Sequence, residues 1–510
     1  MATQSFYSKN RATKAAKYTI VFRAISIPAT IVGSILLVRL LSEEQYGVYN
    51  ILYALLPAVI AVLSFGLDNS VSRYIPEFVK DGEFRLAKRL GQVAQLIRLL
   101  TSTAAMLALI VFWEHWSEWL NITAYRGVFI IFAALLLFHL QYSLLSTILS
   151  SYLLHKYSVG AGAGVAVFKT VGYAFFWLRG GDLVYVLFLE LGIFAFFTIA
   201  LFAAELTKID NSKGRRSTLG TQSRRRIIRY AAYYNFNDIG AFTLGNKIDV
   251  FFLAAIISPT AVGAYSLATM ISHLTRQISP VAFFETVIKP LFFSLDHVTQ
   301  AEDVTKHFQL LVKLTLIFSF PLAAFLASFH SPIVSIVFAG RFQDHSYLIG
   351  VIMSFSLVSR VGVVVSLIAQ LAEKAGIVLA SKIFVVYNVI AILWLVPRYG
   401  VLGAAIATGT ALVFKEVFIW WHVRDLASLH GLGRFLIVNL VYWFGFAGIS
   451  ILIRNFTANS VTELMLGTLL FSVFLFFYMR LELMSIREKQ FLRSALPHKA
   501  VVVLSRLDFI

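Results

Sequence analysis

The sequence lacks cysteine and is poor in charge. With no cysteine among 510 residues, disulfides, thiolate metal sites and cysteine nucleophiles are excluded. Charged residues make up only 14% of the chain, about half the share of an ordinary soluble protein. A soluble chain of this length would form roughly three or four domains with well-hydrated surfaces, and this composition does not supply such surfaces.

What is abundant is apolar. Hydrophobic residues make up 59% of the chain, with 46 Phe and 21 Tyr, against about 45–50% apolar residues in soluble proteins. A membrane helix needs about 20 mainly apolar residues. The sequence therefore predicts an all-α polytopic membrane protein with about fourteen transmembrane helices. The predicted spans cover residues 18–41, 48–67, 90–113, 127–150, 158–178, 183–205, 231–257, 264–285, 313–338, 346–371, 377–396, 401–421, 435–453 and 461–479.

Basic residues between the spans fall on one side of the predicted membrane. With the N-terminus assigned to the cytoplasm, cytoplasmic segments hold 30 Lys and Arg, boundary residue Lys313 included, and the opposite loops hold 5. This asymmetry follows the positive-inside rule, so we predict that both termini are cytoplasmic. The net charge of +18 then belongs to cytoplasmic loops, and we expect no nucleic-acid partner.

Motifs for nucleotide-driven or hydrolytic chemistry are missing. The chain has no G-x-x-x-x-G-K-[ST] and no H-E-x-x-H sequence, which excludes Walker-type nucleotide binding and a zincin site. The opposite loops are all short, leaving no room for a soluble catalytic domain on that face. We therefore expect a transport protein rather than an enzyme, with no cofactor.

A short internal repeat indicates two related halves. Residues 41–49 (LSEEQYGVY) and 257–265 (ISPTAVGAY) match in Ser, Gly and Tyr at an offset of 216, and each joins the first two spans of its half. Parallel repeats related by an axis along the membrane normal are typical of transporters. We predict two six-helix bundles around a central cavity, plus two extra helices. The predicted parts are an N-terminal bundle (1–205), a basic cytoplasmic linker (206–230), a C-terminal bundle (231–430), helices 13 and 14 (431–480) and a cytoplasmic tail (481–510).

Several stretches resemble a known family. They are LLSEEQYGVY at 40–49, GLDNSVSRYIPE at 66–77, KID at 247–249 and VGAYS at 262–266. These resemble the Wzx-type polysaccharide repeat-unit flippases of the multidrug, oligosaccharidyl-lipid and polysaccharide exporter superfamily. The resemblance implies a multi-pass protein of the bacterial cytoplasmic (inner) membrane. It would move undecaprenyl-pyrophosphate-linked oligosaccharide from the inner to the outer leaflet for polysaccharides such as lipopolysaccharide, driven by an ion gradient.

Four basic residues fall near the centres of predicted spans: Lys169, Lys247, Arg276 and Arg360. Each costs about 2.5–3.5 kcal/mol at a helix centre, so the four together would cost about 10–14 kcal/mol. Such residues usually face a watery cavity or pair with acids, and mid-span acids are fewer. We predict a cationic cavity that binds a pyrophosphate headgroup; internal salt bridges with snorkelling are the alternative. Related lipid II flippases carry an essential arginine early in helix 1, and this resemblance adds Arg23.

Asp249 is the leading candidate for the coupling ion, with Glu190 next. A mid-span carboxylate can hold a proton or coordinate Na⁺ through its oxygens. The family would place Asn388, Thr408 and Thr410 beside the span of Asp249 as neutral oxygen ligands. The alternative is that Asp249 pairs with a cation of the protein. The coupling ion is predicted to be Na⁺ or H⁺, and we expect no other metal.

Prolines inside spans are the predicted hinges for alternating access. They are Pro28, Pro57 and Pro280, each of which removes a backbone hydrogen bond from its helix. Ordinary curvature is the alternative interpretation, since proline is common in membrane helices. Beyond the lipid-linked oligosaccharide, we expect membrane lipids and polysaccharide polymerase machinery as partners of a monomer. A cation-coupled multidrug extruder, and a membrane polymerase or glycosyltransferase, are the competing functions.

Overall fold

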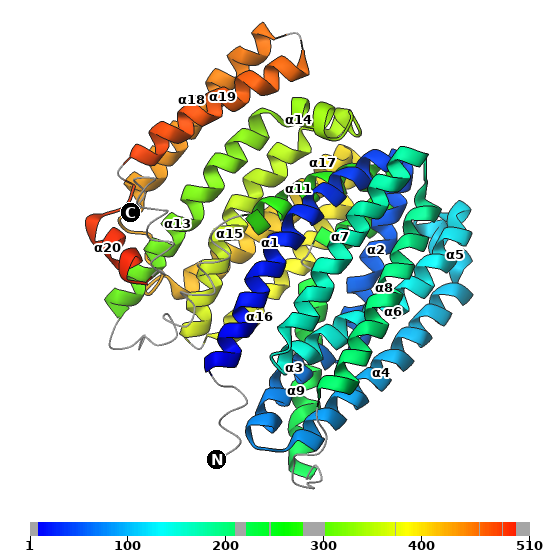
Figure 1. Ribbon diagram of the computed structural model, residues 1–510. Coiled ribbons are helices and arrows are strands. Elements are labelled where there is room, and N and C mark those ends of the chain that lie inside the picture. Colours follow the sequence, from blue (N-terminus) through cyan, green and yellow to red (C-terminus); the bar gives the residue numbers. More distant parts are fainter. Residues whose placement is uncertain are drawn as a thin grey trace. The chain divides into compact units, whose positions relative to one another are not determined.

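The computed structural model describes residues 9–209, 221–243, 246–278, 301–372, 374–457, 459–481 and 483–495. Throughout these ranges the secondary structure is helical, with no strand (Figure 1). The helices form two compact units, Met1–Ser266 and Leu267–Ile510.

The first unit contains the helices of the N-terminal half of the chain and continues into α11. They are α1 (Lys9–Leu40), α2 (Glu43–Leu63), α3 (Leu67–Lys80), α4 (Phe84–Val111), α5 (Trp113–Trp119), η1 (Thr123–Tyr125), α6 (Arg126–Ser151), α7 (His155–Arg179), α8 (Leu183–Lys208), α9 (Thr221–Thr243), α10 (Asn246–Ile256) and α11 (Pro259–Ile278). Helices α1 and α7 pack along their lengths, and so do α6 and α8.

The apolar core of this unit lies where α3, α4 and α6 meet. Val71 and Ile75 of α3, Ala87 of α4, and Leu144 and Leu149 of α6 are fully buried there. Because α3 is apolar along one face only, it packs this face on the bundle and leaves the other for polar side chains.

The two copies of the repeat begin their helices in the same way. Ser42 caps α2 by accepting a hydrogen bond from the backbone N–H of Gln45 at 3.2 Å, and Gln45 reaches back to Ser42 in a capping box. At the equivalent place, the Ser258 hydroxyl accepts from the backbone N–H of Ala261 at 3.3 Å. A serine in this position satisfies a backbone donor that the helix start leaves free.

Two glycines of the first unit allow close backbone packing. A Cβ atom at Gly47, in the first repeat, would overlap the carbonyl group of Pro259 in the second repeat. Gly66, just before α3, has φ +64° and lies against the carbonyl group of Ala231 in α9. Glycine is therefore required at Gly66 both by backbone conformation and by space.

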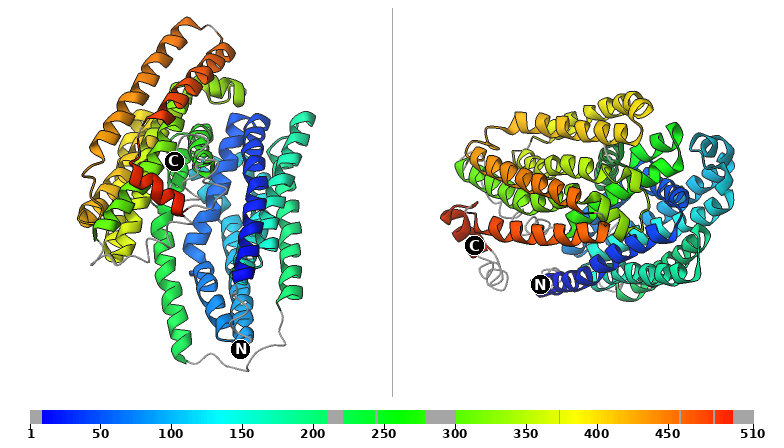
Figure 2. Two further views of the ribbon diagram at one scale, coloured as in Figure 1. Left: turned by 60° about the vertical axis from the view of Figure 1, so that its left-hand side comes forward. Right: turned by 90° about the horizontal axis from the view of Figure 1, so that it is seen from above.

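The second unit contains the rest of α11 and all later helices. These are α13 (Ala301–Ser328), α14 (His330–Val337), η2 (Gln343–His345), α15 (Leu348–Leu371), α16 (Ala375–Ala380), η3 (Ser381–Ile383), α17 (Phe384–Val423), α18 (Gly433–Phe456), α19 (Ser460–Arg480) and α20 (Ile486–Ala495). Within it α13 packs on α15 and α15 on α17, while α18 and α19 lie side by side as a pair (Figure 2).

Helix α17 is a hairpin of two arms. A straight helix of its 40 residues would extend about 60 Å, twice the hydrocarbon thickness of a membrane. Gly400, with φ +57° and ψ −137°, interrupts it. Hydrogen bonds then join side chains about twenty positions apart, Tyr387 to Thr410 and Thr408 to Asn388. The two arms correspond to the separately predicted spans 377–396 and 401–421.

The described residues contain eleven helices that are long and apolar enough to cross a membrane, with both arms of α17 inside one of them. The prediction of an all-helical, multi-pass membrane protein is confirmed. Several predicted spans do not appear as single helices in the described ranges. Span 313–338 is divided between α13 and α14, and span 377–396 begins in α16 and η3 before α17. Span 231–257 is divided between α9 and α10, and span 264–285 runs beyond the end of α11 at Ile278. The count of fourteen remains a prediction.

Candidate functional site

A buried ion pair lies inside the first unit. The side chain of Glu190 in α8 is 0% exposed. Its Oε1 forms an ion pair at 2.5 Å with the Nζ of Lys169 in α7, whose side chain is 20% exposed. Three tyrosine hydroxyls donate to the same carboxylate. Tyr49 donates to Oε1 at 2.9 Å, Tyr173 donates to Oε1 as well, and Tyr53 donates to Oε2. We call these five residues the Glu190 cluster.

Helical spacing assembles the Glu190 cluster. Tyr49 and Tyr53 are four residues apart on α2, and Lys169 and Tyr173 are four residues apart on α7. Residues at this spacing share one face of a helix, so each helix presents two polar groups to Glu190. The ammonium of Lys169 also lies 5.3 Å from the ring centre of Tyr53, a cation–π contact that adds to its stabilisation.

The Glu190 cluster balances its own charge. Both carboxylate oxygens of Glu190 have donors, and its negative charge is matched by Lys169. The sequence placed Lys169 in the headgroup cavity and Glu190 among the coupling residues, and the structure joins them in one ion pair. An added cation at Glu190 would have to displace Lys169. Both assigned roles stay predictions.

A second polar cluster lies in the other unit, around Arg360 of α15. Arg360 is 8% exposed and donates through Nη1 to Ser319 Oγ at 3.0 Å and through Nη2 to Thr275 Oγ1 at 2.6 Å. A longer contact of 3.5 Å reaches the carbonyl oxygen of Ser272. We call these four residues the Arg360 cluster.

The Arg360 cluster keeps its positive charge. Its contacts are hydroxyl and carbonyl oxygens, and no ion pair to Arg360 occurs in the part of the chain that the structure describes. Arg276, one turn beyond Ser272 on α11, is close enough to add electrostatic repulsion. A guanidinium carries five N–H donors and suits phosphate oxygens in a bidentate arrangement. The arrangement is therefore chemically able to bind an anion.

Asp249, the leading coupling candidate, is fully buried in α10 of the first unit. The Tyr265 hydroxyl of α11 donates to its Oδ2. Tyr265 is the repeat equivalent of Tyr49, which donates to Glu190. Each repeat thus provides a tyrosine that binds a buried carboxylate.

The three neutral oxygen ligands predicted for the coupling ion lie on the arms of α17, in the second unit. The Thr408 hydroxyl donates to Asn388 Oδ1 at 3.1 Å, and both residues are buried. Thr410 instead contacts the Tyr387 hydroxyl at 3.1 Å and the backbone carbonyl of Ile406. The structure brings Asn388 and Thr408 together and directs Thr410 elsewhere.

The remaining predicted headgroup residues differ from Arg360 in burial. The side chains of Arg23, Lys247 and Arg276 are exposed. Of the predicted hinges, Pro28 and Pro57 lie inside α1 and α2, which stay helical across them. Pro280 lies outside the described residues, so its hinge role, like the others, remains a prediction.

Sequence reasoning missed the three tyrosines of the Glu190 cluster and the partner of Arg98. Arg98 of α4 is 2% exposed and forms an ion pair with Asp68 of α3. The spacing of four residues between Tyr49 and Tyr53 was the available signal, since two hydroxyls on one face of a span predict a polar partner. Among the described residues no group of three or more His, Cys, Asp or Glu could hold a metal ion.

Comparison with known proteins identifies the family. The chain matches the polysaccharide biosynthesis protein family over residues 12–296, more than half its length. The chain belongs to this family. A probable low-salt glycan biosynthesis flippase of Haloferax volcanii, Agl15, is 23% identical over 395 residues, which are 76% of this chain and 78% of that protein.

Solved structures show the same fold. The lipid II flippase MurJ in an inward closed conformation matches with a TM-score of 0.66 and 13% identity, over 90% of this chain and 99% of that one. An inward-facing multidrug resistance transporter of the MATE family, in the MOP superfamily, matches with a TM-score of 0.62 and 14% identity, over 80% and 94%. The chain is thus a multi-pass membrane protein of the polysaccharide biosynthesis family with a MurJ- and MATE-like fold.

Proposed function

We propose that this flippase moves undecaprenyl-pyrophosphate-linked oligosaccharide from the inner to the outer leaflet of a bacterial cytoplasmic membrane. Membership of the polysaccharide biosynthesis family and similarity to a glycan biosynthesis flippase support a lipid-linked glycan as cargo. The cargo combines a long apolar chain, which stays in lipid, with a diphosphate and sugars that must cross the apolar layer. The transporter has to supply a polar, cationic path for that headgroup.

The observation that carries the proposal is the Arg360 cluster. Among the described residues Arg360 has no counter-anion; such a buried cation is costly, and natural proteins keep such groups mainly where they have a function. A diphosphate would supply the missing negative charge and accept the remaining guanidinium hydrogens. Arg276, Lys247 and Arg23 are exposed on spans or at their ends and would add to the attraction along the path.

The architecture we propose consists of two six-helix halves enclosing a central cavity, followed by helices 13 and 14. The equivalent serine caps at Ser42 and Ser258 support the repeat. The charge asymmetry between loops supports cytoplasmic termini. In this arrangement residues 206–230 connect the halves on the cytoplasmic side.

For energy coupling we propose ion binding at Asp249, with Asn388 and Thr408 as neutral oxygen ligands. Burial of Asp249 and its tyrosine hydrogen bond support a group that exchanges a proton or Na⁺. Glu190 is a weaker candidate, because Lys169 already balances its charge. A drug extruder for cationic cargo would favour unpaired acids, so the paired state of Glu190 also argues against that alternative.

The test is transport by the purified protein in liposomes. The assay follows a fluorescent polyprenyl-diphosphate-linked saccharide that becomes accessible to a membrane-impermeant quencher, under an imposed Na⁺ or pH gradient. We expect Arg360→Gln to lower the initial rate about ten- to hundred-fold, since a hydrogen bond to a charged group contributes about 1.5–3 kcal/mol. Arg360→Lys should restore part of the rate, because it keeps the charge but not the bidentate geometry.

The matched control is Arg398→Gln. Arg398 is exposed in the same unit and lies over the ring of Trp394, so the variant loses the same charge away from the Arg360 cluster. It should transport at the wild-type rate. Equal rates for Arg360→Gln and Arg398→Gln would refute the proposed role of Arg360.

A further inference from the structure

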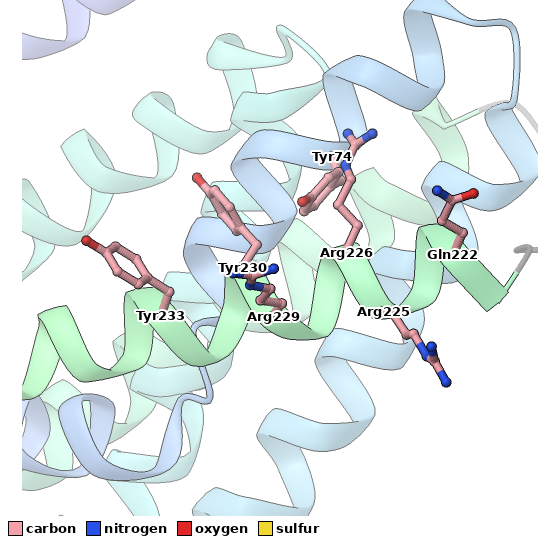
Figure 3. A pocket seen from close by; sticks show the side chains of 7 residues that line it. All are labelled: Tyr74, Gln222, Arg225, Arg226, Arg229, Tyr230 and Tyr233. Carbon is pink, nitrogen blue, oxygen red and sulfur yellow. The ribbon is translucent and has the colours of Figure 1, made fainter. Parts of the chain in front are cut away.

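An open pocket of about 780 Å³ lies on the first unit, between α3 and α9. It is outside both clusters described above. Its lining is unusual in having three arginines and three tyrosines (Figure 3): Tyr74, Gln222, Arg225, Arg226, Arg229, Tyr230 and Tyr233.

Most of these side chains come from one face of α9. Gln222, Arg226, Tyr230 and Tyr233 follow one another at intervals of four, four and three residues, which aligns them along a helix. Figure 3 shows Arg226 and Tyr230 directed toward Tyr74 of α3, whereas Arg225 points away from that group. The helix therefore presents a basic, aromatic face to α3, and Arg225 lines the pocket without pointing toward Tyr74.

The walls of the pocket are ordered by contacts. The guanidinium of Arg226 lies 5.1 Å from the ring centre of Tyr74 and forms an ion pair with Glu77, one turn further along α3. The Tyr74 and Tyr230 rings meet edge to face at 5.4 Å. Such stacking fixes the side chains before any ligand binds, which lowers the entropy cost of binding.

Backbone packing holds the two helices in this position. Gly66, at the start of α3, lies against the carbonyl of Ala231 in α9. Asn69 donates to Asp238 Oδ2 at 3.1 Å, and the Ser64 hydroxyl contacts Asn235 at 3.3 Å. These links span α9 next to the pocket, so its shape belongs to the fold of the first unit.

The pocket has a surplus of positive charge. The described residues of its lining include three arginines and no acid; Glu77 pairs with Arg226 and balances one of them. Arg73 adds a further cation near Tyr230. Burial, together with the neighbouring Tyr234 hydroxyl, raises the pKa of Tyr230 to about 12, so Tyr230 remains a hydroxyl donor at neutral pH.

We propose that this pocket binds the phosphate groups of a lipid headgroup at the cytoplasmic end of the first unit. The guanidinium groups of arginine and the hydroxyls of tyrosine are donors that match phosphate oxygens. The negative charge of a bound phosphate would add to that of Glu77 and offset the repulsion among the arginines. The cytoplasmic placement rests on the proposed function and its orientation. The headgroup comes either from the diphosphate cargo before its entry or from an anionic phospholipid of the leaflet.

The proposal predicts a graded response among neighbouring residues. Binding of farnesyl diphosphate to the purified full-length protein is measured by calorimetry, with farnesol as the uncharged control. Arg229→Gln and Arg226→Gln should each weaken binding about tenfold or more, as expected for a lost charge-assisted hydrogen bond. Arg224→Gln removes the same charge from an exposed position of α9 that is not among the lining residues, and it should change binding less than about threefold, in the range of an exposed charge.

Two further variants preserve the packing. Tyr230→Phe keeps the ring contact with Tyr74 and should weaken binding several-fold through loss of the hydroxyl alone. Glu77→Gln frees Arg226 from its ion pair and should strengthen binding. If Arg224→Gln weakened binding as much as Arg229→Gln did, the pocket would be only a diffuse basic surface and the proposal would be wrong. The same conclusion would follow if both Glu77→Gln and Tyr230→Phe left binding unchanged.

Competition identifies the source of the headgroup. The same titration is repeated with the protein in nanodiscs of phosphatidylglycerol or of phosphatidylcholine. If phosphatidylglycerol nanodiscs lower the affinity for farnesyl diphosphate, phosphatidylcholine nanodiscs do not, and Arg229→Gln removes this difference, the headgroup is that of a membrane phospholipid. If the affinity is undiminished in both kinds of nanodisc, the headgroup is that of the cargo. Absence of binding in detergent and in both kinds of nanodisc overturns the proposal.

These binding measurements stand apart from the transport assay. Arg360→Gln should lose transport and keep binding at the pocket. Normal transport by Arg360→Gln, together with weakened binding by Arg229→Gln, would refute the proposed role of Arg360 and leave the pocket intact. If Arg360→Gln lowered transport and Arg229→Gln left binding unchanged, the pocket proposal would be refuted and the proposed role of Arg360 would stand.

Discussion

Lys169 and Arg360 are both cations inside predicted spans, yet their surroundings differ. Lys169 has a buried carboxylate and aromatic rings around it, whereas Arg360 has two hydroxyls and a carbonyl oxygen. The carboxylate and the ammonium of the first arrangement match each other's charge, whereas the charge of the second is not matched by any acid within the described ranges. A cation in a membrane span is thus informative about cargo only after its partners are known.

The largest effect that this comparison predicts is on stability. Lys169→Met leaves the Glu190 carboxylate buried without its counter-charge, and breaking a buried pair from one side costs about 3–5 kcal/mol. Thermal unfolding of the purified protein measures the loss. Lys156→Met, an exposed lysine at the start of the same helix, is the control, and Lys169→Met combined with Glu190→Gln should recover most of the stability. Equal melting temperatures for the two single variants would show that the ion pair is not structural.

A smaller effect separates two tyrosines of α2. Tyr53 is the donor to Glu190 Oε2, while Oε1 keeps Tyr173 and Lys169 after the loss of Tyr49. Tyr53→Phe should therefore cost about 1–3 kcal/mol, as for a buried group left unsatisfied, and Tyr49→Phe below about 1 kcal/mol. Chemical denaturation of both variants provides the comparison. A larger loss of stability for Tyr49→Phe than for Tyr53→Phe would mean that the Glu190 carboxylate can rotate to give Oε2 another donor.

The smallest expected change in stability is at Arg360. Arg360→Met removes a buried charge that has no ion-pair partner in the described part of the chain, and the Thr275 hydroxyl still donates to the carbonyl of Ser272 at 2.8 Å. Replacing a buried charge with an apolar chain of similar volume is often neutral, so we expect a change within about 1 kcal/mol, with transport lost. A stability loss as large as that of Lys169→Met would remove the distinction between the two clusters.

The sequence was sufficient to locate the charged residues but not to pair them. Span position and residue type identify Lys169, Arg360 and Glu190. The pairing of Lys169 with Glu190 depends on how α7 and α8 rotate against each other, and hydropathy carries no information on this. The hairpin in α17 followed from hydropathy because each arm is apolar over a full membrane thickness. Span 231–257 proved different because its polar residues belong to two helices, α9 and α10.

The pocket on α9 shows a second limit of the sequence, which concerns the surroundings of charged residues rather than their pairing. The run of arginines at 224–226 predicts a polar linker, because charge without apolar anchors usually indicates solvent exposure. Tyr230 alters that interpretation, since its ring packs on Tyr74 of α3 and the guanidinium of Arg226 lies over the same Tyr74 ring. A search for arginine and tyrosine four residues apart would have found this face.

The contact between Gly47 and Pro259 has a consequence for how this lineage can change over generations. The obstacle to a side chain at position 47 is a backbone carbonyl, which every amino acid carries, so no substitution at position 259 can make room. Drift at position 47 is therefore blocked as long as α2 and α11 begin against each other. Descendants that keep this crossing should keep glycine at 47, and a descendant with any other residue there should have moved the two helix starts apart.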